Sequence, residues 1–394
     1  MTAINARAAC CAKIEVGFGG VSLGEVVAMK IAQISPLIES VPPKLYGGTE
    51  RVVSYLTEEL VGQGHDVVLF ATGDSQTTAE LVPCWPEALR LAPVRDTMPY
   101  NVLQLEQVRR RARDFDILHF HSDFMHFPLV RNLACDSVTT MHGRLDLPDY
   151  WPLFSEYGDM PLVSISDHQR LRLSARWLAT IHHGLPPDLY EFSSAGATGY
   201  LAFLGRICPE KRPDRAIEVA ARSGLELKIA AKVDKVDQAY FDEVIRPLLA
   251  NPRVEFIGEI DEWEKQEFLG GARALIFPID WPEPFGLVMI EAMACGTPVI
   301  AWREGSVPEV IDHGSAGFIV DTIDEAITAV QRIGSLDRQQ VRNRFEERFT
   351  IERMVWDYVK AYASLVTPDL VIPTLRDAGI SESVDHDYQL GEQA

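Results

Sequence analysis

Residues 278–311 read PIDWPEPFGLVMIEAMACGTPVIAWREGSVPEVI. The apolar runs at 273–278 and 298–302 are short enough for buried strands, and the segment between them has the length of a loop and a helix. Pro284 disfavours a helical conformation at Glu283, so we expect the helix to begin at Pro284 or at the next residue. A strand, a loop, a helix and a second strand in this order predict one unit of a parallel α/β sheet.

The same alternation of apolar runs and amphipathic segments extends over most of the chain. A helix is predicted at 49–64, where Val52, Leu56 and Leu60 recur at helical spacing and a glycine ends the segment. Because continuous apolar strands between helices are typical of parallel sheets covered on both faces, the sequence predicts an α/β fold with two Rossmann-like domains in tandem. The expected strands lie at 30–35, 66–71, 116–120, 137–142, 161–166 and 179–184, and then at 200–205, 226–231, 254–258, 273–278 and 298–302.

Changes in composition mark the boundaries of these domains. Residues 1–28 lack the features of a signal peptide, and Met29 opens the first predicted strand, so we expect this extension to be disordered or to precede the true start. Small polar residues at 193–199 predict a linker, and the acidic residues beyond 366 are typical of a loosely held tail. The predicted segments are 1–28 (extension), 29–192 (first domain), 193–199 (linker), 200–350 (second domain), 351–366 (final helix) and 367–394 (tail).

Charge and cysteine content bear on the class of function. The 394 residues carry 37 basic and 57 acidic side chains, a net charge of −20, which argues against a nucleic-acid partner. The basic cluster Arg109–Arg113 is interpreted as a solvated helix face, or at most as a peripheral membrane contact. The 6 cysteines form no C-x-x-C pair, and without an export signal we expect reduced thiols in the cytoplasm.

Ligands of open α/β sheets bind beyond the carboxyl ends of the strands, so the candidate ligand-binding residues are those that directly follow the predicted strands. In the first half, Gly47 and Gly48 precede the helix at 49–64, where glycine permits a close approach of the backbone and a helix N-terminus favours an anion. His142 ends a predicted strand and is followed by a glycine. The histidines within 119–126 do not have the spacing of metal ligands, so we expect no metal site.

The second half offers two cations and two carboxylates. Arg206 and Lys211 flank the loop between a strand and a helix, a placement that suits a diphosphate. If the segment from Glu283 to Glu291 were helical throughout, the two carboxylates would be about 80° and about 12 Å apart, too far for the acid–base dyad of a glycoside hydrolase. Glu283 therefore suits sugar hydroxyls, Glu291 suits a ribose diol, and the backbone amides near Gly286 suit an anion.

The motifs around these residues resemble those of glycosyltransferase family 4. The similarity covers residues 29 to about 365. EPFGLVMIEAMACGTPVIA (283–301) resembles the E-x7-E signature of the family, FLGRICPEK (203–211) its F-x-G-R…K segment, and HHGLPPDLY (182–190) the segment that ends its first domain. Three earlier segments of the chain also occur in the order of the family: YGGTERVV (46–53), DILHFHS (116–122) and TMHG (140–143).

The resemblance implies a GT-B fold, in which two Rossmann-like domains face each other across the active site and the final helix crosses back to the first domain. It also implies a hexosyltransferase that moves a hexose from a nucleotide-diphospho-sugar to an acceptor hydroxyl. The anomeric configuration would be retained, and neither a metal nor a cofactor other than the donor would be needed.

The resemblance also implies roles for the candidate residues. Four are expected to be catalytic: Arg206 and Lys211 hold the leaving diphosphate, Glu283 contacts the sugar hydroxyls, and His142 lines the acceptor and sugar side. The expected substrate-binding residues are Gly47, Gly48, Phe285, Gly286, Leu287 and Glu291, of which Glu291 binds the ribose and Phe285–Leu287 offer backbone to the sugar or phosphate. His183, Leu185 and Ser306 depart from the residues that the family usually carries.

Two alternatives share the predicted fold: a nucleotide-sugar epimerase and a non-catalytic protein that binds a nucleotide sugar. A Rossmann dehydrogenase is disfavoured because no G-x-G-x-x-G follows a predicted strand. The predicted partners are a nucleotide-sugar donor and an acceptor that is a glycan, a lipid-linked molecule or a small metabolite. The sequence does not choose among these acceptors, nor does it specify the donor base, the sugar, the linkage or the oligomeric state.

Overall fold

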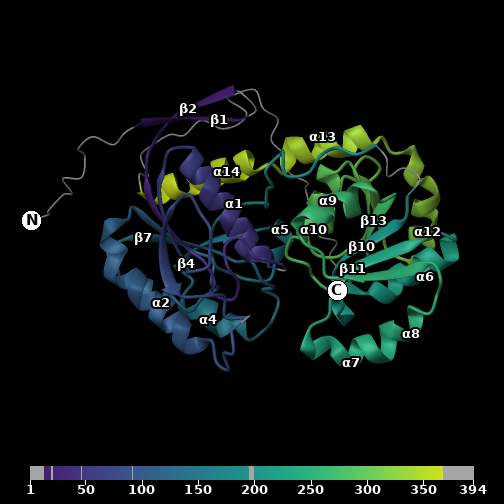
Figure 1. Cartoon of the computed structure of the whole chain (residues 1–394). Coiled ribbons are helices and arrows are strands. Elements are labelled where there is room, and N and C mark those ends of the chain that lie inside the picture. Colours follow the sequence, from purple (N-terminus) through teal and green to yellow (C-terminus); the bar gives the residue numbers. More distant parts are fainter. Residues whose placement is uncertain (1–12, 19–20, 46, 91, 195–198, 367–394) are drawn as a thin grey trace, which may run out of the picture.

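The chain folds into two domains, each built on a parallel sheet with helices on both faces (Figure 1). The computed structural model describes residues 13–18, 21–45, 47–90, 92–194 and 199–366. This arrangement confirms the predicted α/β fold with two Rossmann-like domains.

The first domain contains a 7-stranded sheet of order β5-β4-β3-β6-β7-β8-β9. All neighbouring strands are parallel, and the order reverses between β3 and β6, so this sheet has a topological switch point. The strands are β3 (Lys30–Ile34), β4 (Asp66–Thr72), β5 (Glu80–Trp85), β6 (Ile117–Phe120), β7 (Asp136–Thr140), β8 (Pro161–Ser164) and β9 (Arg176–Thr180).

The helices of the first domain follow the predicted apolar periodicity most clearly in α1 (Gly48–Gly62). Val52, Val53, Leu56 and Leu60 of this helix are fully buried against the sheet and the final helix. The other helices are α2 (Met98–Arg111), α3 (Phe127–Val130), α4 (Tyr150–Glu156) and α5 (Asp167–Arg170).

The basic cluster 109–113 lies at the end of α2 (Met98–Arg111) and just beyond it. Arg109 and Arg110 pair with Glu106 one turn earlier, and Arg111 pairs with Glu80 of β5. Most of this cluster therefore forms exposed ion pairs within its own domain. A peripheral membrane contact at this helix stays a prediction.

The second domain contains a 6-stranded parallel sheet of order β12-β11-β10-β13-β14-β15. Its order also reverses once, between β10 and β13, which is the Rossmann arrangement. The strands are β10 (Leu201–Arg206), β11 (Leu227–Lys232), β12 (Val254–Gly258), β13 (Ala274–Phe277), β14 (Val299–Trp302) and β15 (Gly317–Val320).

The helices of the second domain cover both faces of this sheet. Between β13 and β14 lies α10 (Leu287–Ala294), and it is buried on nearly all sides because it packs between the sheet and α13. The others are α6 (Pro213–Ser223), α7 (Gln238–Tyr240), α8 (Arg246–Leu248), α9 (Glu262–Gly270), α11 (Val307–Val310), α12 (Ile323–Arg332) and α13 (Arg338–Arg348). No helix among the described residues is both long and apolar enough to cross a membrane.

The final helix, α14 (Ile351–Val366), returns to the first domain, as predicted. In Figure 1 it is the yellow helix that lies against α1, and its residues Trp356, Tyr358 and Tyr362 are buried in the core of the first domain. The loop after β9 crosses the segment that leads into α14. The two touch at Gly184, where a Cβ atom would lie 2.2 Å from the carbonyl oxygen of Thr350. Glycine is therefore required at this crossing because the two backbones leave no room for a side chain.

Several sequence predictions differ from the structure in detail. Residues 13–18 (β1) and 21–27 (β2) pair as an antiparallel sheet, where we expected a disordered extension; residues 1–12 lie outside the described residues. Strands β5 and β15 were not predicted. Pro83 and a single buried position obscure the pattern of β5, and β15 has only 4 residues. Strand β9 ends at Thr180, so residues 181–184 belong to a loop and not to the strand expected at 179–184.

The remaining predicted domain boundaries stay predictions. The tail at 367–394 and most of the linker at 193–199 lie outside the described residues. The start at Met29 also stays a prediction. The two domains contact each other directly. The Glu309 carboxylate of the second domain accepts hydrogen bonds of 2.7 Å from the backbone amides of Asp167 and His168 in the first domain.

Candidate functional site

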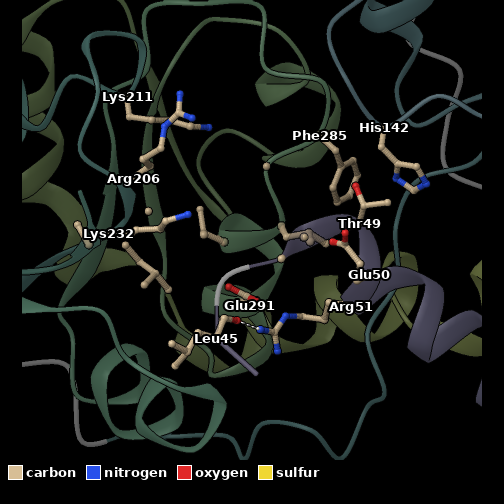
Figure 2. Close-up of a pocket in the computed structure, with 18 of the residues that line it drawn as sticks. Leu45, Thr49, Glu50, Arg51, His142, Arg206, Lys211, Lys232, Phe285 and Glu291 are labelled. Carbon is tan, nitrogen blue, oxygen red and sulfur yellow. Dashed lines mark hydrogen bonds between the residues drawn. The ribbon is translucent and has the colours of Figure 1, made fainter. Parts of the chain in front are cut away.

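A cleft of about 480 Å³ lies between the two domains, at the carboxyl ends of the central strands (Figure 2). Loops at both topological switch points contribute to its wall, as expected for ligand sites of this fold. Every residue predicted for the site lines this one cleft: Gly47, Gly48, His142, Arg206, Lys211, Glu283, Phe285, Gly286, Leu287 and Glu291. The structure thus brings together residues that are up to 244 positions apart in the sequence.

Glu283 and Lys211 form an ion pair inside the cleft. The Lys211 ammonium donates to Glu283 Oε2, and the Trp281 indole donates to the same oxygen at 2.8 Å. Lys211 Nζ also lies 4.9 Å from the centre of the Trp281 ring, so the cation is held by a carboxylate and an aromatic face. Each of these two charges therefore has the other as its partner at the wall of the cleft.

Arg206 ends β10 and faces a group of carboxylates. Its Nε lies 3.4 Å from Asp237 Oδ2, and its Nη1 lies 3.8 Å from Asp234 Oδ2. Lys232, at the end of the adjacent β11, pairs with Asp234 at 2.8 Å. Asp234 and Asp237 hold Arg206 and Lys232 at the wall of the cleft. The Arg206 side chain is still 36% exposed, so these ion pairs do not close the cleft.

The N-terminus of α10 opens into the cleft. The helix begins at Leu287 with Gly286 as its N-cap, three residues later than the earliest predicted start at Pro284, because Gly286 takes a left-handed φ of 80°. A Cβ atom at Gly286 would lie 2.9 Å from Met289 and 3.0 Å from Phe277, so glycine is required there. The first backbone N–H groups of a helix have no partner within it, and they suit an anion.

Glu291 lies on α10 at the floor of the cleft and is only 2% exposed. Its Oε1 accepts a hydrogen bond of 2.8 Å from Lys265 Nζ of α9. Its Oε2 is buried and has no hydrogen-bond partner among the described residues. One oxygen is thus held by the protein, and the other is available to a ligand hydroxyl.

His142 belongs to a partly buried row of hydrogen bonds. Its Nε2 lies 2.9 Å from His121 Nδ1, and His121 Nε2 lies 2.8 Å from Gln33 Oε1. Because an amide oxygen only accepts, His121 must carry its proton on Nε2, and His142 Nε2 then donates to His121 Nδ1. Gln33 in turn donates to the hydroxyl of Tyr362 on α14 at 3.2 Å.

This row fixes the chemical state of His142. Burial lowers the pKa of His142 to about 3, so the imidazole is neutral near pH 7. Its Nδ1 is buried and makes no hydrogen bond with the described residues. With the proton on Nε2, Nδ1 is a hydrogen-bond acceptor. The ring of His183 stacks on His142 with centres 5.4 Å apart, so an imidazole occupies the position where the family often has an amide.

Several charged residues of the cleft were missed by sequence reasoning. Lys232 directly follows the strand predicted at 226–231, so the search for polar residues after strands could have found it. Glu39 and Arg90 form an ion pair although they are 51 positions apart, and no periodic pattern connects them. The charged residues that line the cleft and were not among the predicted site residues are Glu39, Glu50, Arg51, Arg90, Lys232, Glu259 and Lys265.

Glu50, in the first turn of α1, is the missed residue with the most perturbed carboxyl group. It is 5% exposed, and burial together with the nearby Glu39 carboxylate raises its pKa to about 7. Glu50 makes no ion pair with the described residues, whereas Glu39 is paired with Arg90. The first-domain wall of the cleft therefore holds a carboxyl group that changes its charge near neutral pH.

Comparison with known proteins agrees with this geometry. The family model described as glycosyl transferases group 1 matches residues 192–349, and the model described as glycosyltransferase family 4 matches residues 46–181. An N-acetyl-alpha-D-glucosaminyl L-malate synthase from Bacillus anthracis is 32% identical over 366 residues, which cover 82% of this chain and 95% of that relative. The chain belongs to glycosyltransferase family 4.

Other relatives of this glycosyltransferase are similar over most of their length. A phosphatidyl-myo-inositol mannosyltransferase from Mycolicibacterium smegmatis is 26% identical over 90% of this chain and 96% of its own. Among solved structures, sucrose-phosphate synthase from Thermosynechococcus elongatus has a TM-score of 0.70 at 19% identity and matches 86% of this chain and 100% of its own. HepE from Anabaena, solved with UDP-glucose, has a TM-score of 0.66 at 15% identity over the same shares of the two chains.

These comparisons confirm the predicted family and the GT-B fold. The protein is a glycosyltransferase that uses a nucleotide-sugar donor. The roles of the individual cleft residues remain predictions, which the geometry described above allows us to make specific.

Proposed function

We propose that this glycosyltransferase moves a hexose from a nucleotide-diphospho-sugar to an acceptor hydroxyl, with retention of configuration and without a metal ion. The observation that carries the proposal is the convergence of two cations and the α10 N-terminus beside the buried carboxylate of Glu291 in one interdomain cleft. The names of the relatives support a hexose, since one is a glucosaminyl enzyme and another a mannosyltransferase.

Departure of the diphosphate is the step that most needs the protein, because negative charge develops on the leaving oxygen. Arg206 and Lys211 supply positive charge there, and the amides at Leu287 supply the positive end of a helix. Lys211 is now paired with Glu283, and an arriving diphosphate would draw the ammonium toward itself. Glu283, still held by the Trp281 indole, is then free to accept hydrogen bonds from the sugar hydroxyls.

The acceptor side is assigned to the wall that contains Gly47, Gly48 and His142. The neutral His142 offers Nδ1 as a hydrogen-bond acceptor, so it can orient a hydroxyl of the acceptor or of the sugar. The bond between the anomeric carbon and the diphosphate oxygen breaks as the bond to the acceptor oxygen forms on the same face. The acceptor proton passes to the departing diphosphate oxygen, so no protein base is required.

The test is release of nucleoside diphosphate from a panel of UDP-, GDP- and ADP-sugars, with and without a chelator. We expect one donor to be consumed at a rate that the chelator does not change. Absence of release from every donor would support the non-catalytic alternative, and an altered free sugar would support the epimerase.

Arg206→Ala tests the diphosphate role within the same assay. We expect kcat to fall by about 100-fold, the loss typical of removing one group that stabilises developing charge, and the donor KM to rise. Arg303→Ala is the matched control, because Arg303 makes a surface ion pair with Asp321 at 3.2 Å and does not line the cleft. Equal activity in the two variants would remove Arg206 from the site.

A further inference from the structure

Four charged side chains of alternating sign form a row across the domain interface, from α1 of the first domain to α10 of the second. We call Arg51, Glu262, Lys265 and Glu291 the interdomain charge row. Arg51 pairs with Glu262, Lys265 Nζ lies 3.6 Å from Glu262 Oε2, and the same Nζ lies 2.8 Å from Glu291 Oε1. Lys265 thus has two carboxylates within reach, one of which is the candidate ribose ligand.

The row is largely removed from water. The side chains of Arg51, Lys265 and Glu291 are 10%, 12% and 2% exposed, and that of Glu262 is 24% exposed. At such burial, charges interact more strongly than in water, and each needs a partner to offset its lost hydration. Burial also lowers the pKa of Lys265, a shift that the Glu291 carboxylate opposes.

Arg51 is the member of the row that comes from the opposite domain. Its Nη2 donates to the Leu45 carbonyl at 3.1 Å, which anchors the guanidinium in the first domain. Figure 2 shows this bond and places Arg51 and Glu291 in the same part of the cleft. Glu262 receives a second donor, the Tyr190 hydroxyl, so its charge is well satisfied while Arg51 is present.

We propose that Arg51 is a positioning residue for the donor site: by pairing with Glu262, it leaves Lys265 to hold the Glu291 carboxylate in the orientation that binds ribose. The inference rests on the proposed role of Glu291 as the ribose ligand. Arg51 itself does not need to touch the donor. Without Arg51, Glu262 becomes a poorly compensated anion 3.6 Å from Lys265 Nζ, and it competes with Glu291 for that ammonium.

The orientation of the Glu291 side chain matters because only one of its two carboxylate oxygens has a hydrogen-bond partner among the described residues. Lys265 holds Glu291 Oε1, and Oε2 is buried with no hydrogen-bond partner among the described residues. A ribose hydroxyl that donates to this oxygen would complete its hydrogen bonding. If Lys265 moves toward Glu262, Glu291 loses the contact that fixes its rotamer, and ribose binding weakens.

The experiment compares binding of UDP, ADP and GDP with binding of their 2′,3′-dideoxy counterparts by isothermal titration calorimetry. All three share the ribose, so the comparison does not depend on which base the enzyme prefers. For the nucleotide that binds best, we expect the wild type to prefer the ribose form by at least about tenfold, because a hydroxyl donated to a carboxylate is a charge-assisted hydrogen bond. We expect Arg51→Gln to bring the ratio close to one.

A second variant separates positioning from general damage to the fold. In Arg51→Gln/Glu262→Gln, the anion that competes for Lys265 is also removed, and the amide at position 262 can still accept from Tyr190. We expect the ribose preference to return to within about threefold of the wild-type ratio, which a loss of folding could not produce. Arg353→Gln, which breaks an α14 ion pair outside the cleft lining, should keep the wild-type ratio.

The outcomes distinguish this inference from the proposed function. A wild type that prefers the ribose form, together with an unchanged preference in Arg51→Gln, overturns the positioning role alone. Failure of the double variant to recover the preference also overturns it. A wild type that binds ribose and dideoxy forms equally overturns the ribose role of Glu291 and this inference with it.

Discussion

Gly305, on the loop after β14, offers a sharp test of how the cleft is held in shape. Its φ is +56°, a left-handed conformation that residues with a Cβ atom rarely adopt. A Cβ atom there would lie 2.3 Å from both the backbone nitrogen and the carbonyl oxygen of Glu283. Gly305→Ala therefore pushes directly on the residue that we assign to the sugar hydroxyls and that pairs with Lys211.

The size of the effect follows from these distances. Non-bonded atoms pack comfortably at about 3.5 Å, so the Glu283 backbone has to move by about 1 Å. Ser306 resists this movement, since its backbone amide donates to the Glu283 carbonyl at 3.0 Å and its hydroxyl donates to the Phe285 carbonyl at 2.7 Å. A displacement of about 1 Å at reacting groups can lower the rate by about 100-fold, and we expect a loss of that order in kcat/KM.

Gly314 is a matched control for the backbone strain. Its φ is +87°, also left-handed, but among the described residues beyond its two chain neighbours no atom lies within 4 Å of the position that a Cβ would take. Both substitutions should destabilise the fold by about 1–2 kcal/mol through the unfavourable φ, and only Gly305→Ala should displace Glu283. Gly314→Ala should therefore retain nearly the full rate of donor consumption.

The assay is donor consumption per mole of folded protein, measured with the nucleotide sugar found in the panel. Circular dichroism below the melting transition checks that both variants are folded at the assay temperature. If Gly305→Ala retains the activity of Gly314→Ala, then either the loop yields without moving Glu283 or the position of Glu283 does not matter for transfer. Either result would refute the prediction that a Cβ atom at position 305 lowers the rate by displacing the Glu283 backbone.

Two further predictions concern stability. Tyr362→Phe removes a hydroxyl that lies 2.7 Å from His119 Nδ1 and 3.2 Å from Gln33 Nε2; we expect the free energy of unfolding in urea to fall by about 2 kcal/mol, since two buried polar groups lose a partner. Because burial raises the pKa of Glu50 from 4.5 to about 7, its favourable contribution is complete below pH 4.5 and is lost as the pH rises through 7. The loss amounts to about 3 kcal/mol, and Glu50→Gln should remove this part of the fall in stability over that range in pH-dependent urea titrations.

The alternation of strands and helices could be predicted from local pattern because each element buries its own apolar positions. The run VVLFA in β4 and the helical spacing in α1 are sufficient for that. Strands β5 and β15 escaped prediction; both lie at the edges of their sheets, and β5 also has a proline in it. The start of α10 was placed too early because the left-handed Gly286 delays the helix, and a left-handed residue leaves no periodic signal.

The site was predictable where its residues follow strands or carry a motif, as Arg206 and Glu283 do. Ser306, which we noted only as a departure from the usual glycine, proves to be fully buried and to donate its hydroxyl to the cleft loop. Its function could not be inferred from sequence, because the carbonyl that it binds belongs to Phe285, 21 positions earlier. The pairing of Glu39 with Arg90 escaped notice for the same reason.

The sequence by itself thus determined the α/β architecture, the two domains, the family and the main cleft residues, since all of these depend on local periodicity or on motifs. Only the tertiary structure decided the state of those residues. Examples are the neutral His142 whose Nε2 bonds to His121, the pairing of Lys211 with Glu283, and the row of charges from Arg51 to Glu291 across the domain interface. Burial and the distance between charges control these states. Both quantities arise only when segments that are far apart in the chain are packed against each other.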